Sequence, residues 1–288
     1  MRKTLLNISG KLDPISIAIY EQIAKIAMSQ KIPFFIIGAT ARDLILHHGY
    51  GIKVRRATKD IDLAVHVASW DEFQALKNKL IETVPFSETK MMQRLMYQES
   101  IPIDIVPFGA IKEPDGSISW PPDHDIRMNI LGFDDAYSDA MPVRLKTEPE
   151  LDVLVASPTS LAALKLISWK DRAPENTKDA IDLMFIIQNY LDIGNHERLH
   201  DKHSDLIDEN FDYVRAGARL LGRDIATILK EQVITKVQQI LKEQTVDGDR
   251  YPLVEDMSRG ESGEKIQENL ELLKCLMKGV LDVTEETP

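Results

Sequence analysis

Cysteine is almost absent from this sequence: among 288 residues there is one, Cys275. A single cysteine excludes an internal disulfide, and it also excludes a cysteine-rich metal site. Its neighbours, in LELLKCLMKG, have the apolar pattern of a helix face, where a free cysteine packs as a small hydrophobic residue. Chains of this kind are typical of a reducing compartment, so we expect a cytoplasmic protein.

Long apolar runs and an excess of basic residues are lacking as well. Without a run of about 18 apolar residues we expect no transmembrane helix and no membrane partner. The first residues include two basic side chains but too short an apolar stretch for a signal peptide. Asp and Glu number 46 against 35 Lys and Arg, a formal net charge of -11. This charge argues against broad, sequence-independent nucleic-acid binding, which needs a dominating positive field, but it does not exclude a local basic patch.

The periodicity of the apolar residues predicts an α/β (α+β) fold with two domains, 1–154 and 155–288. The first begins with a helix that Asp13 caps and Pro14 opens. Strands and helices then alternate, which indicates a mixed sheet: strands are expected at 32–38, 62–67, 94–98 and 101–108, and helices at 39–48 and 69–82. Turns and short strands fill the stretch to residue 155. The second domain is helical, with periodic segments at 160–172, 178–191, 205–221, 223–243 and 263–280, and a loop is expected at 245–265.

Two aspartates share one face of a predicted strand, although aspartate is disfavoured in strands. In KDIDLAVHV the apolar residues alternate, so Asp60 and Asp62 point to the other face, roughly 7 Å apart at their Cα atoms. Asp104 is placed in the same way on the later strand IPIDIVPF. If these two strands are neighbours, three carboxylates converge, and like charges at that distance call for a cation. The alternative is a solvent-facing edge strand with scattered acidic residues.

The chemistry of this carboxylate set favours divalent metal ions. Oxygen ligands that leave room for water and substrate phosphate suit Mg²⁺. Two such ions can activate an attacking hydroxyl and stabilise a leaving pyrophosphate. Gly38 ends a predicted strand and opens a helix, a geometry that lets backbone amides approach a phosphate.

These features together resemble a known family. The ordered set of a glycine-led helix turn, an Asp-x-Asp strand and a third aspartate is similar to the polymerase-β-type nucleotidyltransferases. In particular, residues 30 to 190 resemble the AbiEii-type abortive-infection toxins and their uncharacterised relatives. The positions that match the family motifs are Arg56, Thr58, Asp60 and Asp62, then Lys165, and then Lys178, Asp179, Asp182 and Leu183.

The resemblance implies roles for these residues. Asp60 and Asp62 would bind Mg²⁺ or Mn²⁺ with a nucleoside triphosphate (NTP), and Asp104 would complete the metal site and accept a proton from the acceptor hydroxyl. The residues implied to contact the nucleotide are Gly38, Ala39, Thr40, Arg42, Thr58 and Lys165. Ala39 departs from the family, which commonly has Gly-Gly or Gly-Ser at this turn. This departure weakens the expected phosphate affinity more than the expected fold.

Several of these positions keep a second interpretation. Arg42 and Asp43 resemble the Arg-Asp of a tRNA nucleotidyltransferase element, where they hold a phosphate or brace the turn, but a local helix ion pair explains them equally well. Lys165 borders an apolar helix face and would neutralise phosphates or merely extend to solvent. Asp179 and Asp182 lie on one helix face and either orient Lys165 or are solvated. We expect Lys165→Ala to weaken triphosphate binding with little change in melting temperature.

The function that the resemblance implies is transfer of a nucleoside monophosphate (NMP) from an NTP to an acceptor hydroxyl, with release of pyrophosphate. The acceptor is left open between tRNA, a protein side chain and a small molecule. A toxin of a toxin–antitoxin pair would also have an antitoxin protein as partner. The competing class is a non-catalytic module that keeps the nucleotidyltransferase fold for binding a nucleotide or a partner.

Overall fold

The computed structural model describes residues 4–54, 60–83, 85–173, 175–207, 212–246, 250–259 and 261–285. The chain divides into two compact units, Met1–Ser157 and Pro158–Pro288. The first unit is a mixed sheet with helices and the second is helical, so the expected fold class is confirmed. Assigning catalysis to residues 1–154 stays a prediction.

One eight-stranded mixed sheet organises the described part of the first unit. Its strand order is β1-β9-β10-β2-β3-β6-β5-β4, and β7 and β8 form a separate pair. The strands are β1 (Leu6–Asn7), β2 (Phe34–Ile36), β3 (Ile61–Val67), β4 (Phe86–Glu88), β5 (Arg94–Tyr97), β6 (Ile101–Gly109), β7 (Ser117–Ser119), β8 (Arg127–Asn129), β9 (Met141–Thr147) and β10 (Glu150–Val155). β3 and β6 are parallel neighbours, while β2 and β5 flank them as antiparallel strands. The sequence predicted β2, β3, β5 and β6, but β9 and β10 are longer than the short strands expected there.

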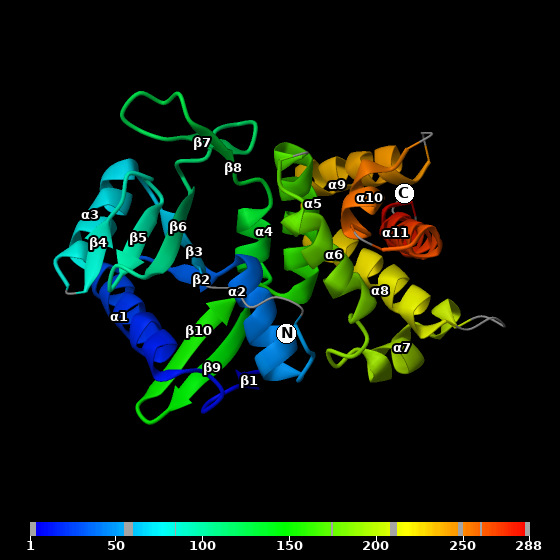
Figure 1. The fold of residues 1–288 in the computed structure, drawn as a ribbon, viewed down its shortest axis with the longest axis horizontal. Helices are drawn as coiled ribbons and strands as arrows, with labels where there is room; N and C mark the ends of the chain where they lie inside the picture. The colour runs from blue at the N-terminus through cyan, green and yellow to red at the C-terminus, as the bar shows by residue number, and fades with distance from the viewer. Residues whose placement is uncertain are drawn as a thin grey trace. The chain divides into compact units, whose positions relative to one another are not determined.

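Helices cover the sheet of the first unit. They are α1 (Pro14–Gln30), α2 (Gly38–Arg42), the π-helix η1 (Asp43–Gly49), α3 (Trp70–Ile81) and α4 (Phe133–Ser138). Asp13 caps α1 as predicted, because its carboxylate accepts hydrogen bonds from the backbone of Ile15 and Ser16. In Figure 1 α1 (blue) and α3 (cyan) lie at the same edge of this unit; the two helices contact each other, and α3 contacts β3 and β4. The short helix α4, which the sequence did not predict, packs Tyr137 against the rings of Phe35 and Phe108.

The second unit is built from helices. They are α5 (Pro158–Arg172), α6 (Lys178–Gln188), α7 (His196–Lys202), the 3-10 turn η2 (Ser204–Leu206), α8 (Tyr213–Ile228), α9 (Glu231–Thr245), α10 (Pro252–Met257) and α11 (Gly263–Thr284). The sequence predicted a break at residue 222, which is wrong because α8 runs through it and ends near Leu229. The loop expected at 245–265 contains α10, whose Leu253 and Val254 are buried. α7 was not predicted.

Two glycines let α8 and α11 touch backbone to backbone. A Cβ placed on Gly279 of α11 would overlap the carbonyl oxygen of Arg219 and lie 2.8 Å from its carbonyl carbon. A Cβ on Gly222 of α8 would likewise overlap the carbonyl oxygen of Leu276 and lie 2.8 Å from the amide nitrogen of Val280. Any larger residue at either glycine must therefore push the two helices apart.

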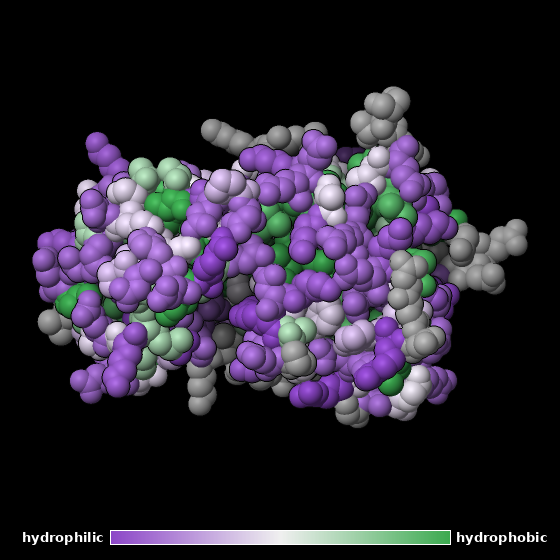
Figure 2. Space-filling model, turned by 90° about the horizontal axis from the view of Figure 1, so that it is seen from above, coloured by the Kyte–Doolittle hydropathy of each residue, from purple (hydrophilic) through white to green (hydrophobic). Residues whose placement is uncertain are grey.

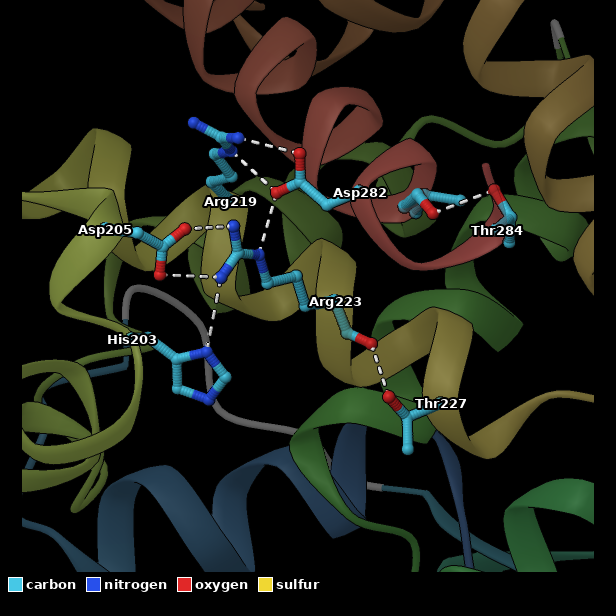
Figure 3. A network of polar contacts seen from close by, with 8 residues as sticks. His203, Asp205, Arg219, Arg223, Thr227, Asp282 and Thr284 are labelled. Carbon is cyan, nitrogen blue, oxygen red and sulfur yellow. Dashed lines mark hydrogen bonds and ion pairs between the residues drawn. The ribbon is translucent and has the colours of Figure 1, made fainter. Parts of the chain in front are cut away.

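A charged network fixes the same pair of helices (Figure 3). Two arginines of α8 converge on Asp282 of α11: Arg219 donates Nε and Nη2 at 2.8 and 2.7 Å, and Arg223 donates Nε at 2.7 Å. Arg223 also forms a bidentate pair with Asp205 of η2. Burial disfavours the charged form of Asp282, but the two guanidinium groups outweigh burial and lower the pKa of this carboxyl. The network therefore links α8, α11 and η2.

Hydrophilic residues dominate the face in Figure 2, and hydrophobic residues appear there as separate patches. This distribution agrees with a chain in which charged residues make up 28% of the sequence. Across the described ranges, the structure contains no helix long and apolar enough to cross a membrane.

Candidate active site

The predicted carboxylates come together at one end of the central strands. β3 and β6 pair in parallel, and their register places Asp62 directly opposite Asp104. Neighbouring residues in register point to the same face, so the two carboxylates lie side by side. Asp60 immediately precedes β3, and its side chain is about half exposed. β3 and β6 are thus neighbours, as the expected convergence of the carboxylates requires.

A residue that the sequence argument missed stands beside these carboxylates. Arg94 of β5 is opposite Asp104 in the antiparallel register, so Arg94, Asp104 and Asp62 form a row across three strands. Its guanidinium donates Nε to Asp104 Oδ1 at 2.7 Å and Nη2 to Oδ2 at 2.6 Å. The same Nη2 is 3.9 Å from Asp60 Oδ2. These hydrogen bonds to Asp104, together with the charges of Asp60 and Asp62, raise the pKa of Arg94.

The three carboxylates supply the oxygen ligands that a divalent cation needs, but their present spacing is not that of a metal site. Within the part of the chain that the structure describes, no three His, Cys, Asp or Glu side chains gather closely enough to hold a metal ion. At this place the fork of Arg94 engages both oxygens of Asp104. The guanidinium is itself a cation drawn to this cluster, and carboxylate oxygens are the ligands that Mg²⁺ prefers. The donor chemistry of Asp60, Asp62 and Asp104 therefore fits a cation, whereas their present spacing leaves Asp104 paired with Arg94.

Gly38 is the residue that lets the helix turn approach the carboxylates. Its φ is +67°, a backbone conformation that glycine adopts freely. A Cβ on Gly38 would overlap Oδ2 of Asp62 and lie 2.8 Å from its Cγ, so no side chain fits without moving Asp62. The amide of Ile37, the residue before, donates to the carbonyl of Asp62 at 3.0 Å. The glycine turn and the carboxylate strand thus form one local structure.

The other residues expected at the nucleotide are placed as follows. Thr40 is 8% exposed and its hydroxyl donates to the backbone carbonyl of Asp60 at 2.7 Å, so it braces the turn against the strand. Ala39 is also buried, at the start of α2. Arg42 is 4% exposed and donates to Asp43 Oδ1 from Nε and Nη2. This contact is the local helix ion pair that was the second interpretation of these two residues. Thr58 lies outside the described residues, as does Arg56.

Lys165 is the centre of a buried ionic cluster in the helical unit. Its ammonium donates to Asp179 Oδ1 at 2.9 Å and to Asp182 Oδ2 at 2.8 Å, and Arg172 donates to the other oxygen of Asp179. The side chains of Asp179 and Asp182 are 3% and 6% exposed, so these residues orient Lys165 and are not solvated. Burial alone would lower the pKa of Lys165, but the two carboxylates more than compensate and raise it.

Because of this burial, we expect Lys165→Met to lower the free energy of unfolding by about 3 kcal/mol, since two buried carboxylates lose a shared cation. This expectation of a large loss of stability replaces the one from sequence, which was that Lys165→Ala changes the melting temperature little. Lys170→Met is the matched control on the same helix, because Lys170 pairs with Glu243 at the surface and both side chains are more than a third exposed. It is expected to cost less than about 1 kcal/mol. Urea unfolding of both variants measures the difference, and equal losses would contradict a structural role for the cluster.

Comparison with protein families identifies the chain. The profile of the family described as "Nucleotidyl transferase AbiEii toxin, Type IV TA system" matches residues 27–254. This range includes the glycine turn, all three carboxylates, Arg94 and the Lys165 cluster. No curated protein sequence matches the chain.

Solved structures of nucleotidyltransferases are distantly similar to it. The antibiotic-resistance factor ANT(2'')-Ia is 12% identical, with 68% of this chain and 96% of that chain covered and a TM-score of 0.36. A CCA-adding enzyme in complex with ATP is 15% identical, with 96% and 72% covered and a TM-score of 0.34. The Thermotoga maritima CCA-adding enzyme complexed with tRNA is 13% identical, with 95% and 82% covered and a TM-score of 0.28. Since the family profile spans most of the sequence, the chain belongs to the AbiEii nucleotidyltransferase toxin family of type IV toxin–antitoxin systems.

Proposed function

We propose that this nucleotidyltransferase is metal-dependent and moves an NMP from an NTP to an acceptor hydroxyl at the carboxylates of β3 and β6. The observation that carries the proposal is the register of Asp62 opposite Asp104, with Asp60 one residue before β3. The glycine turn beside Asp62 adds a place where backbone can approach a phosphate closely. Carboxylates, a glycine turn and a nucleotidyltransferase family together support this chemistry better than a purely structural role.

The proposed reaction forms a bond between the acceptor oxygen and the α-phosphorus, and breaks the bond from that phosphorus to the bridging oxygen of pyrophosphate. Asp60 and Asp62 would hold a divalent cation, and Asp104 would share it and accept the proton of the acceptor hydroxyl. When bound, the cation supplies positive charge for the triphosphate and for the leaving pyrophosphate. The chain's own contribution is to fix the carboxylates on paired strands, so that they need little reorganisation.

Lys165 is proposed as the triphosphate contact from the helical unit. The family motif places a lysine at this position, and Asp179 and Asp182 keep its ammonium charged and oriented. A charged ammonium neutralises phosphate oxygens. Arg42 and Thr40 are proposed to act indirectly, by holding the turn that Gly38 begins.

For the acceptor we propose tRNA, which the resemblance to toxins of this kind implies, and we propose an antitoxin protein as the partner of a type IV toxin. Both would meet the enzyme in the cytoplasm. The net charge of -11 means that tRNA would have to be bound at a local basic surface, because the overall field repels it.

The direct test incubates the protein with each NTP, radiolabelled at the α-phosphate that would be transferred, with Mg²⁺ or Mn²⁺ and a mixture of tRNA and protein. We expect label in the tRNA fraction, dependent on the metal, with release of pyrophosphate. Label in protein, or in a small-molecule acceptor added separately, would keep the transfer chemistry and replace the acceptor. If no acceptor is labelled while NTP still binds, the non-catalytic alternative is the better description.

A further inference from the structure

Arg94 has no role in the reaction described so far, yet it makes the most direct contact with the carboxylate set. It comes from β5, whose alternate residues Leu95 and Tyr97 are buried on the opposite face. Cross-strand pairing with Asp104 directs its guanidinium along the row that ends at Asp62. Its side chain is 27% exposed, and that of Asp104 is 20% exposed. An ion pair that is mostly shielded from water is much stronger than one at the surface.

The hydrogen bonds from Arg94 engage the carboxylate oxygens of Asp104 that a metal ion would need as ligands. A carboxylate has two oxygens, and the bidentate fork of Arg94 occupies one direction of approach to both of them. A divalent cation arriving from the same side would meet the guanidinium at close range, and two positive charges repel strongly in a half-buried site. The nearness of Arg94 to Asp60, at 3.9 Å, extends this conflict to a second proposed ligand.

We propose that Arg94 is the internal counter-cation of the carboxylate set, which holds Asp104 in place without metal and which a divalent cation must displace from Asp104. Arg94 is thus a positioning residue that competes with the metal and sets the metal concentration at which the site fills. The inference rests on the proposed function, because it assumes that the carboxylates bind a cation. Arg94 lies outside the family motifs, and the inference gives it control over the metal affinity of the site.

The test measures metal binding and not turnover. Mn²⁺ is titrated into the full-length metal-free protein by isothermal titration calorimetry, for wild type, Arg94→Gln and Arg94→Lys. Competition predicts that Arg94→Gln binds Mn²⁺ at least about tenfold more tightly than wild type, because a positive charge has been removed from the site. Arg94→Lys keeps the charge but not the bidentate fork, so its affinity is expected between those of wild type and Arg94→Gln.

Arg127→Gln is the matched control. Arg127 also pairs with carboxylates in the same unit, Glu113 and Asp115, but on β8, away from the row of β3, β6 and β5. Its Mn²⁺ affinity is expected to equal that of wild type. Melting curves without metal show whether each variant is folded. If Arg94→Gln does not fold, the Mn²⁺ affinity of Arg94→Lys is compared with that of wild type instead.

The outcomes separate this inference from the proposed function. If wild type binds Mn²⁺ and Arg94→Gln binds it equally or more weakly, Arg94 supports the site instead of competing for it, and the inference is overturned while the metal-dependent function stands. If wild type shows no Mn²⁺ binding at millimolar concentrations, with or without NTP, the metal-dependent function fails and this inference falls with it. If Arg94→Gln binds Mn²⁺ more tightly than wild type and Arg127→Gln does not, the result supports both the metal-dependent function and the competition by Arg94.

Discussion

Replacing Asp62 by asparagine is expected to reduce nucleotidyl transfer by about a thousand-fold or more, because the metal-binding role proposed for this carboxylate would contribute several kcal/mol to the transition state. The metal-free variant is expected to be at least as stable as wild type. Asp62 stands opposite Asp104, whose charge is paired with the guanidinium of Arg94, and Asp60 lies on the same side, so removing one negative charge is expected to relieve repulsion between like charges. The two effects of one substitution thus have opposite signs, which a general loss of folding would not produce.

Melting curves with and without Mg²⁺ and NTP measure the second half of this prediction. Ligands that bind only the folded state stabilise it by mass action, so wild type should melt at a higher temperature with Mg²⁺ and NTP, and Asp62→Asn should not. Asp71→Asn is the control: the same change in the same unit, at an exposed position in the first turn of α3. It should keep both activity and the metal-dependent shift. An unchanged shift in Asp62→Asn would mean that Asp62 does not bind the cation.

Replacing Gly279 by alanine is expected to destabilise the helical unit by about 3 kcal/mol or more, which corresponds to roughly 10 °C in melting temperature. The added methyl would overlap the carbonyl oxygen of Arg219, and backbone cannot move aside as a flexible side chain can. Separating α8 from α11 would also stretch the ion pairs from Arg219 and Arg223 to Asp282. The loss should therefore exceed that of an ordinary overpacked core position.

Gly263→Ala provides the comparison on the same helix. Gly263 begins α11 and a Cβ there meets nothing within 4 Å, so alanine should be neutral or slightly stabilising. Thermal and urea unfolding of both variants give the difference. If Gly279→Ala unfolds at the same temperature as Gly263→Ala, the close helix crossing is not a determinant of stability.

Alternation along single strands predicted the carboxylate positions from sequence. Because side chains on a strand alternate between two faces, Asp60, Asp62 and Asp104 could be assigned to one side before any pairing was known. The pairing itself is a long-range property, and residue order does not determine which strands are neighbours. Arg94 alternates with Leu95 and Tyr97 in the same way, so the same signal was present for it. It was overlooked because a lone arginine on a strand is common at surfaces.

The helical unit shows a different limit of sequence reasoning. Sequence left two interpretations open for Lys165, and for Asp179 and Asp182 it left open whether they orient Lys165 or are solvated. Helical periodicity describes one helix at a time and does not decide between them. Their burial comes from the packing of α5 against α6, which puts three charged side chains into a shared interior.

The break wrongly predicted at residue 222 also results from considering one helix at a time. In sequence, Gly222 has the appearance of a helix end. In the structure it lies inside α8, where the absence of a side chain lets the backbone of α11 approach closely.

The parallel pairing of β3 with β6 also determines when during folding the site comes into existence. Parallel neighbours cannot be joined by a tight turn, so α3, β4 and β5 lie between them in the chain. Contacts between distant parts of a chain form late, after the entropy of closing the intervening loop has been overcome. During synthesis, a chain that has not yet reached β6 carries Asp60, Asp62 and Arg94 but not Asp104. We therefore expect growing and incompletely folded chains to be inert, with activity beginning only at closure of the sheet.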